Sequence, residues 1–221
     1  MLATLVDQPF DSKDWVYETK WDGFRLVAEV RRDSVRLFSR NGIEVTARYP
    51  SIAQALRTIP GPCVIDGELV ALDAKGRSRF QLLQNALRDE STELRYCACD
   101  ILFLGGKDMR RKPLLERKAL LKQVLPRNSL MRYSKHIKAK GTALFKKAKQ
   151  AGLEGVEAGS RALLFRKAYA GVAQVQGDER TGGRHRGIYC PAALAQILRR
   201  PCTRGAHRFK LAVCRACGNG L

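Results

Sequence analysis

Hydrophobic and polar positions change period several times along the first 158 residues, which predicts a chain of alternating strands and helices. Aromatic and β-branched residues that repeat every second position indicate strands, and apolar residues three and four positions apart indicate helices. The predicted strands cover residues 15–19, 26–30, 35–39, 63–73 and 95–104, with another beginning at 153, and the predicted helices cover 49–59, 81–88, 113–125 and 141–151. No internal repeat divides this series.

Short polar signals punctuate these elements. Asp22-Gly23 between two apolar runs predicts a tight hairpin turn, and Asn41-Gly42 predicts a second turn. Residues 78–81 resemble a capping box at the start of a helix, and Gly152 is placed to end the helix over 141–151.

The helix over 113–125 is predicted to be amphipathic. Its expected apolar side consists of Leu114, Leu115, Leu121 and Val124, and its expected polar side of Glu116, Arg117, Lys118 and Lys122.

Charge points to a polyanionic partner. The 221 residues include 41 Lys and Arg against 21 Asp and Glu, a formal net charge of +20. Such an excess favours nucleic acid, although an unspecific basic surface would have the same composition. No run is apolar enough to cross a bilayer and the first residues lack a signal peptide, so we expect a cytoplasmic protein without membrane contact.

The composition changes beyond about residue 159. Residues 159–221 hold twelve of the 41 basic residues, nine of the 19 glycines and only two of the 21 acids, and only residues 191–200 have a helical pattern. A basic nucleic-acid-binding arm and a poorly ordered tail both fit this composition.

Cysteine does not indicate a disulfide framework, because the count of seven is odd and no secretory signal accompanies it. Cys214 and Cys217 form a CxxC pair, but a structural zinc site needs a second pair. Cys190, Cys202 and His207 are too scattered to supply it, and whether the CxxC pair binds metal stays open.

Lys20 is the first candidate for chemistry. It follows a predicted strand and precedes a turn and Arg25. A neighbouring cation disfavours the ammonium form, and only a neutral amine attacks an electrophile. A solvated lysine beside an ordinary hairpin would look the same in these six residues.

Several motifs, which follow one another in a fixed order beginning at Lys20, help to decide whether Lys20 is a nucleophile or a solvated lysine. They are Lys20-Trp21-Asp22-Gly23-Phe24-Arg25, Ser39-Arg40-Asn41-Gly42, Asp66-Gly67-Glu68, the run from Tyr96 to Leu102, and Glu154-Gly155-Val156. This series resembles the covalent nucleotidyltransferases, and among them the ATP-dependent DNA ligases, most closely the ligase module of bacterial non-homologous end-joining ligases. The resemblance covers residues 1–157, leaving 158–221 as a basic segment without a recognisable oligonucleotide-binding barrel. It implies an α+β, ATP-grasp-like nucleotidyltransferase core of antiparallel sheets flanked by helices.

The resemblance also implies roles for individual residues. Lys20 would attack the α-phosphate of ATP and carry AMP. Arg25 and Arg40 would contact sugar, phosphate or the nicked strand, and Glu18 would lie at the adenine pocket. Glu68 would bind ribose or, together with Glu154, hold Mg²⁺ or Mn²⁺.

The implied reaction passes AMP to a DNA 5′-phosphate and seals a nick. The implied partners are nicked or broken double-stranded DNA and end-joining proteins, with the chain itself expected to be a monomer. An RNA ligase, a capping guanylyltransferase and a non-catalytic basic DNA-binding remnant remain alternatives.

The sequence departs from the family pattern at three places. Cys99 stands where the family has an aromatic residue that stacks on adenine, and a thiol offers little ring-face contact. Glu157 and Gly159 stand where the family has an apolar residue and a phosphate-binding lysine. The closing motif with two lysines is absent. We therefore expect a truncated ligase of weak or lost activity, and hypothesise that residues from about 157 are read out of frame.

Overall fold

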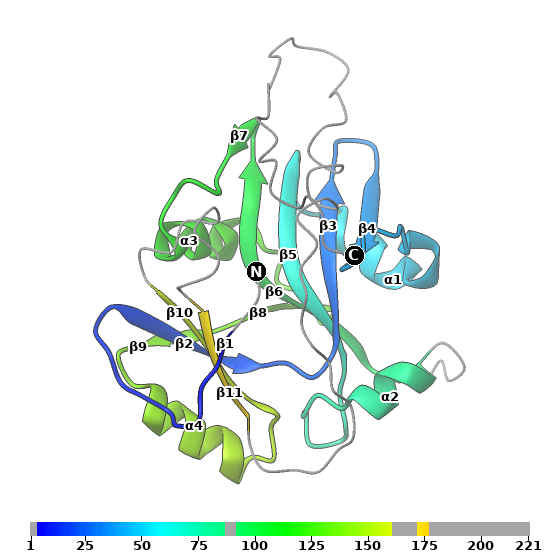
Figure 1. The fold of residues 1–221 in the computed structure, drawn as a ribbon. Helices are drawn as coiled ribbons and strands as arrows, with labels where there is room; N and C mark the ends of the chain where they lie inside the picture. Colours follow the sequence, from blue (N-terminus) through cyan, green and yellow to red (C-terminus); the bar gives the residue numbers. More distant parts are fainter. Residues whose placement is uncertain (1–3, 87–91, 161–171, 177–221) are drawn as a thin grey trace, which may run out of the picture.

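A computed structural model describes residues 4–86, 92–160 and 172–176 as two β-sheets flanked by helices (Figure 1). The strands are β1 (Thr4–Leu5), β2 (Trp15–Lys20), β3 (Phe24–Val30), β4 (Val35–Ser39), β5 (Cys63–Ala71), β6 (Leu94–Leu104), β7 (Lys107–Asp108), β8 (Met131–Tyr133), β9 (His136–Lys138), β10 (Gly155–Ser160) and β11 (Val172–Gln176). The helices are the 3₁₀ turn η1 (Thr46–Arg48), α1 (Pro50–Leu56), α2 (Phe80–Asn85), α3 (Leu114–Val124) and α4 (Gly141–Gln150).

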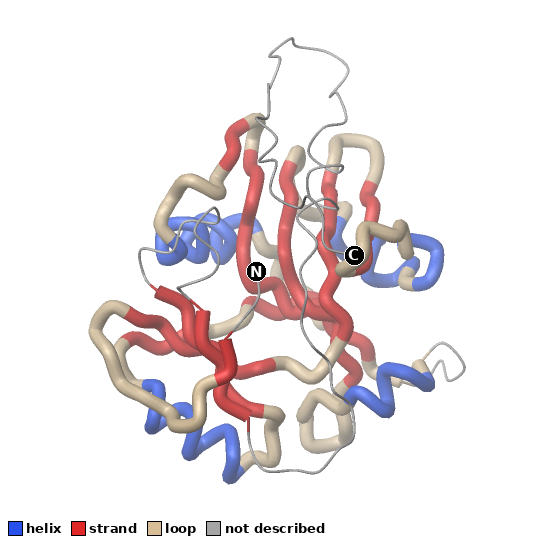
Figure 2. The backbone as a smooth tube through the Cα atoms, viewed as in Figure 1, coloured by secondary structure: helices blue, strands red, loops and turns tan. Residues whose placement is uncertain are grey.

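The two sheets are built mainly from antiparallel pairs. Within the described residues, the five-stranded sheet has the order β1-β11-β10-β2-β9, and the six-stranded sheet has the order β4-β3-β5-β6-β7, with β8 also paired to β6. Only β1 with β11 and β6 with β8 run parallel among these pairs. The α+β class of antiparallel sheets flanked by helices is therefore confirmed (Figure 2).

Each sheet buries one face against helices. The main core joins β3, β4, β5 and β6 to side chains such as Ile52 and Leu56 of α1 and Leu121 of α3, all of them fully buried. A separate cluster packs Tyr17 and Val156 of the five-stranded sheet against Ala148 of α4. None of the helices in the described ranges is both long and apolar enough to cross a membrane.

The predicted hairpin at Asp22-Gly23 is wrong. β2 pairs with β10 and β9, whereas β3 pairs with β4 and β5, so the chain passes from one sheet to the other at this point. Gly23 is not in the left-handed region that a tight turn would need. A Cβ there would overlap the carbonyl oxygen of Leu69 and lie 2.9 Å from a methyl group of Val70. Glycine is thus required by the close approach of β5.

The predicted capping box at 78–81 is also wrong. Helix α2 begins at Phe80, and no side chain of its own N-cap residue, Arg79, binds the helix. Instead the Asp22 carboxylate accepts a hydrogen bond from the Phe80 amide at 2.9 Å, and the Asp22 amide donates to Ser78 Oγ at 3.2 Å. The crossover between the sheets therefore caps α2 from a distant part of the chain.

The expected polar side of α3 needs correction as well. Arg117 and Lys118 are fully buried, as is Leu121, and Leu114 is buried beside them. These four positions follow the spacing i, i+3, i+4, i+7 that marks the inward stripe of a helix. Two cations thus occupy the centre of that stripe, where they need partners.

The other turn and helix-end predictions are confirmed. Gly42 adopts φ 77° and its amide donates to the Ser39 carbonyl at 2.9 Å, which closes the turn after β4. Gly152 adopts φ 63° just after α4, as expected for a glycine that ends a helix. The predicted helix at 191–200, the CxxC pair and the other cysteines beyond 160 lie outside the described residues.

Candidate functional site

Lys20 is the last residue of β2, where the chain leaves the five-stranded sheet. Its Nζ forms an ion pair with Glu154, which lies just before β10. The Lys20 side chain is 14% exposed and that of Glu154 28% exposed. The structure therefore brings these two predicted site residues into direct contact, in a partly closed setting.

Strand register adds two more carboxylates to the same face. Gly155 of β10 lies opposite Lys20, and Glu157 lies opposite Glu18. Side chains of directly opposed residues share a face, as do residues two apart on one strand. Lys20, Glu18 and Glu157 thus point to one side of the five-stranded sheet.

A second set of predicted residues lies on the six-stranded sheet. Arg25 of β3 is opposite Glu68 of β5, and its guanidinium binds both carboxylate oxygens of Asp66, with Nε at 2.9 Å from Oδ1. Arg40 follows β4, which pairs with β3 through Ser39 opposite Leu26. The pKa of Arg40 lies below its ordinary value, because burial and the neighbouring charge of Arg25 outweigh the opposite effect of Glu68.

A glycine keeps Asp66 and Glu68 in place. Gly67 lies against Tyr96, and a Cβ at this position would be 2.7 Å from Tyr96 Cζ. The Tyr96 hydroxyl lies 3.1 Å from the backbone carbonyl oxygens of both Leu26 and Ile65, which share its single proton. The central strands are thereby locked together beneath the two carboxylates.

Electrostatics couple the two sets. Burial lowers the pKa of Lys20, while Glu157, Glu68 and Asp22 raise it. Burial, with Glu157 as the next cause, raises the pKa of Glu68 to about 8, although Arg25 and Lys20 favour its ionised form. Lys20, Arg25, Glu68 and Glu157 therefore form one interacting group at the junction of the sheets.

Glu18 and Cys99 belong to a neighbouring group that sequence reasoning did not assemble. The buried Lys118 donates to Glu18 Oε2 at 2.7 Å and to the carbonyl oxygen of Cys99 at 2.9 Å. Next to it, Arg117 binds Asp100 with contacts of 2.8 to 3.1 Å. The helical spacing of 114, 117, 118 and 121 is the signal that would have found both cations.

The carboxylates fit a metal that is held mainly by phosphates. No cluster of three or more His, Cys, Asp or Glu side chains suited to a metal occurs within residues 4–86, 92–160 and 172–176. Mg²⁺ commonly binds through one or two carboxylates together with substrate phosphates. Glu68, whose burial disfavours its anion, is a carboxyl group that a metal would stabilise, whereas Glu154 would have to exchange its pairing with Lys20 for the metal.

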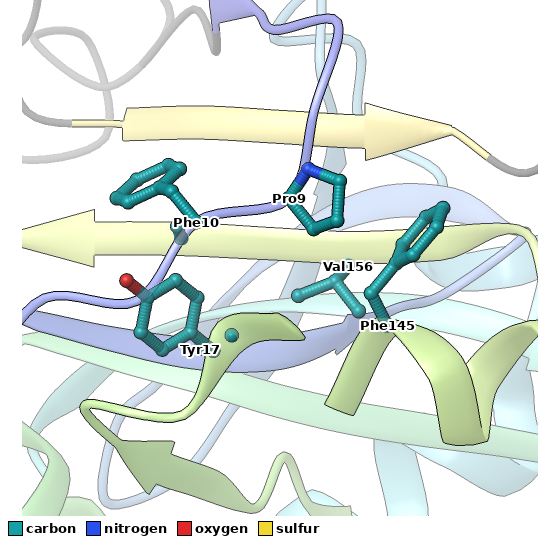
Figure 3. Close-up of a pocket in the computed structure, with 7 residues that line it drawn as sticks. Pro9, Phe10, Tyr17, Phe145 and Val156 are labelled. Carbon is teal, nitrogen blue, oxygen red and sulfur yellow. The ribbon is translucent and has the colours of Figure 1, made fainter. Parts of the chain in front are cut away.

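An apolar hollow lies on the other face of the five-stranded sheet (Figure 3). Pro9, Phe10, Tyr17, Phe145 and Val156 line it, with Phe10 and Tyr17 packed edge to face on one side and Phe145 on the other. Tyr17 and Val156 alternate along their strands with the residues of the charged face. The hollow therefore lies on the face of the sheet opposite to Lys20.

Comparisons with known proteins agree with this geometry. The family model for the ATP dependent DNA ligase domain matches residues 1–163. The multifunctional non-homologous end joining protein LigD of Pseudomonas aeruginosa is 38% identical over 159 residues, which is 70% of this chain and 19% of that protein. The SPbeta prophage-derived DNA ligase-like protein LigB of Bacillus subtilis is 27% identical and covers 71% of this chain and 58% of that protein.

Solved structures give the same result. A mycobacterial DNA ligase D complexed with ATP and MES matches with a TM-score of 0.67 at 29% identity, over 79% of this chain and 60% of that one. The ligase domain of Mycobacterium tuberculosis LigD matches with a TM-score of 0.62 at 28% identity, over 79% and 58%. The chain spans about a fifth of the length of the LigD relatives. With three quarters of its length matched by the family model, the chain belongs to the ATP-dependent DNA ligase domain family.

Proposed function

We propose that this chain catalyses the adenylylation step of an ATP-dependent DNA ligase, with Lys20 as nucleophile. The proposal rests on the position of Lys20. Its side chain is largely buried, its Nζ contacts Glu154, and its charge interacts with that of Glu68. An amine that attacks phosphorus must be neutral, and desolvation lowers the cost of losing its proton. The Lys20 ammonium gives its proton to solvent before the attack, and Glu154, in contact with Nζ, orients the amine.

The proposed step is a nucleophilic substitution at the α-phosphorus of ATP. The Lys20 amine forms a bond to the α-phosphorus of ATP, the bond to the oxygen that leads to the β-phosphate breaks, and pyrophosphate leaves. Arg25 and Arg40 supply donors to sugar or phosphate oxygens, for which the fork of a guanidinium is suited. Glu68 and Glu154 would hold Mg²⁺ or Mn²⁺, which neutralises phosphate charge and the leaving group.

The later steps are proposed by analogy with the family. AMP would move from Lys20 to a DNA 5′-phosphate, and a 3′-hydroxyl would displace it to seal the nick, in repair or end joining. The formal charge of +20 suits a nicked or broken duplex as partner. End-joining proteins as partners, a monomeric state, a cytoplasmic location, and residues 158–221 as a separate segment stay predictions.

Labelling by ATP tests the proposal directly. The full chain is incubated with Mg²⁺ and ATP labelled at the α-phosphate, and the protein-bound label is measured after denaturation. We expect acid-labile label on the wild type, none on Lys20→Ala, and wild-type labelling of Lys75→Ala, an exposed lysine. Label that survives in Lys20→Ala would refute the assignment of the nucleophile.

The same assay separates related activities. Preference for GTP would indicate a capping-type enzyme, and sealing of nicked RNA but not nicked DNA would indicate an RNA ligase. A chain that binds nicked DNA with steep salt dependence but takes no label would be a non-catalytic DNA-binding protein.

A further inference from the structure

Lys118 is a buried cation beside the proposed nucleotide site. It lies on α3 with 0% of its side chain exposed, between Leu114 and Leu121 on the inward stripe. Lysine is almost never fully buried unless it has partners. Neither the motifs nor the proposed adenylylation step assigns it a role.

Its three contacts come from both sheets. Lys118 Nζ is 2.7 Å from Glu18 Oε2 on β2 of the five-stranded sheet, and 2.9 Å from the Cys99 carbonyl oxygen on β6 of the six-stranded sheet. It also lies 5.2 Å from the centre of the Tyr133 ring, at the end of β8. One ammonium group thus joins the two sheets next to the site.

The charge of Lys118 is maintained in this setting. Burial lowers its pKa, but the anion of Glu18, the group at Cys99 and Tyr133 outweigh burial and leave the pKa above its ordinary value. Without Glu18, the buried ammonium of Lys118 would have no compensating charge. Without Lys118, the Glu18 carboxylate would lose the hydrogen bond that fixes its orientation. The pair therefore holds the Glu18 carboxylate in one place.

Glu18 lies two residues before Lys20 on the same face, and an ionised carboxylate can only accept hydrogen bonds. Its Oε2 accepts from Lys118, and its second oxygen can accept from a ligand. At ring position 6, adenine has an amino group that can donate a hydrogen bond to this oxygen. Guanine has an oxo group there, which can only accept. A carboxylate held there would therefore favour adenine and repel guanine.

We propose that Lys118 is a positioning residue that fixes Glu18 and the Cys99 carbonyl at the base-binding wall, and so sets the preference for ATP over GTP. This inference rests on the proposed function, because it takes the charged face around Lys20 as the nucleotide site. It assigns Lys118 no contact with the reacting atoms.

Calorimetric binding of ATP and of GTP to the full chain, without divalent cation, tests the proposal independently of catalysis. We expect the wild type to prefer ATP, and Lys118→Met to reduce that preference about tenfold or more, as loss of a charge-assisted hydrogen bond would. Lys122→Met, which removes an exposed lysine one turn along α3, should keep the wild-type preference. Glu18→Gln and the double variant with Lys118→Met should show the same reduced preference.

The outcomes separate the two proposals. If Lys118→Met weakens ATP and GTP equally, its role is structural and the inference is wrong. If the wild type binds neither nucleotide, both the proposed function and this inference fail. Should Lys118→Met lack a cooperative thermal transition, Lys118→Gln replaces it, since the amide keeps a donor for the Cys99 carbonyl but not the charge.

Discussion

Glu157 brings another carboxylate to a face that is proposed to bind a polyanion. It lies directly opposite Glu18, and Glu68 and Glu154 are close to Lys20. Burial raises the pKa of Glu157, while Arg25 and Lys20 lower it. Like charges that are directly opposed on neighbouring strands destabilise each other. Glu157 also favours the unreactive ammonium form of Lys20.

Glu157→Val should therefore increase adenylylation. Removing the carboxylate lowers repulsion toward the triphosphate and makes the neutral amine of Lys20 easier to form. We expect the initial rate of labelling at subsaturating ATP to rise about tenfold, the equivalent of one pKa unit. Glu116→Gln, which removes an exposed carboxylate from α3, should leave the rate unchanged. An unchanged or lower rate in Glu157→Val would contradict this account.

Glu68 should make the stability of the nucleotide-free protein depend on pH. Its pKa is about 8 in the folded state against 4.5 ordinarily, so between these values the folded state binds one more proton than the unfolded state. Stability is then highest at low pH within this window and falls as pH rises toward 8. Glu68→Gln should remove up to roughly 1.4 kcal/mol per pH unit from the slope.

Denaturant unfolding at intervals from pH 5 to pH 8 measures this slope in both proteins. Glu93→Gln, which removes an exposed carboxyl group outside the candidate site, serves as the matched control. Equal slopes for Glu68→Gln and wild type would show that Glu68 ionises normally.

At the level of elements, the sequence predicts local structure better than pairing. β4 coincides with its prediction, and α1 and α3 lie within theirs, because strand and helix periods are written in neighbouring residues. The hairpin at Asp22-Gly23 failed because partner strands are chosen by non-local contacts. Gly23 is present for the approach of Leu69, 46 positions along the chain, and no local pattern contains that information.

In the candidate site, too, the sequence shows what is local along the chain and does not show what the fold brings together. The motifs around Lys20, Arg25 and Glu68 were visible because they are short and ordered along the chain. Lys118 was missed because charged residues on a helix are ordinarily read as solvent-facing. Its carboxylate partner lies 100 positions earlier, so only the fold brings the two together.

Helix α3 depends on a buried ion pair. Arg117 is fully buried and binds both oxygens of Asp100 on β6, and its Nη1 donates to the Lys112 carbonyl at 2.5 Å. Arg117→Met would leave the Asp100 carboxylate buried without its cation. We expect a loss of about 3–5 kcal/mol in the free energy of unfolding, measured by denaturant titration.

The double variant separates charge from packing. Arg117→Met with Asp100→Leu removes both charges and should recover much of the loss, since an apolar pair needs no compensation. Lys122→Met on the exposed side of α3 should change stability by less than about 0.5 kcal/mol. A loss for Arg117→Met as small as that of Lys122→Met would show that the pair contributes little.

At the scale of the whole molecule, the departure of the sequence from the family pattern, which begins at Glu157, can be traced by experiment. The family model matches as far as residue 163, and within that match β10 continues to Ser160 and pairs with β2 throughout. Strand pairing uses backbone groups, so it tolerates foreign side chains such as Glu157 and Gly159. Backbone pairing is therefore compatible with a shift of reading frame inside the strand.

We expect one of the other two frames of the coding DNA, from about codon 157, to encode an apolar residue, Ala and Lys, followed by an oligonucleotide-binding barrel. Translating both frames decides this, and a chain rebuilt in that frame should take up label faster than the present one, because the restored lysine would bind phosphate. If neither frame encodes such a lysine, the shift did not occur, and Glu157 and Gly159 are substitutions within an unbroken frame.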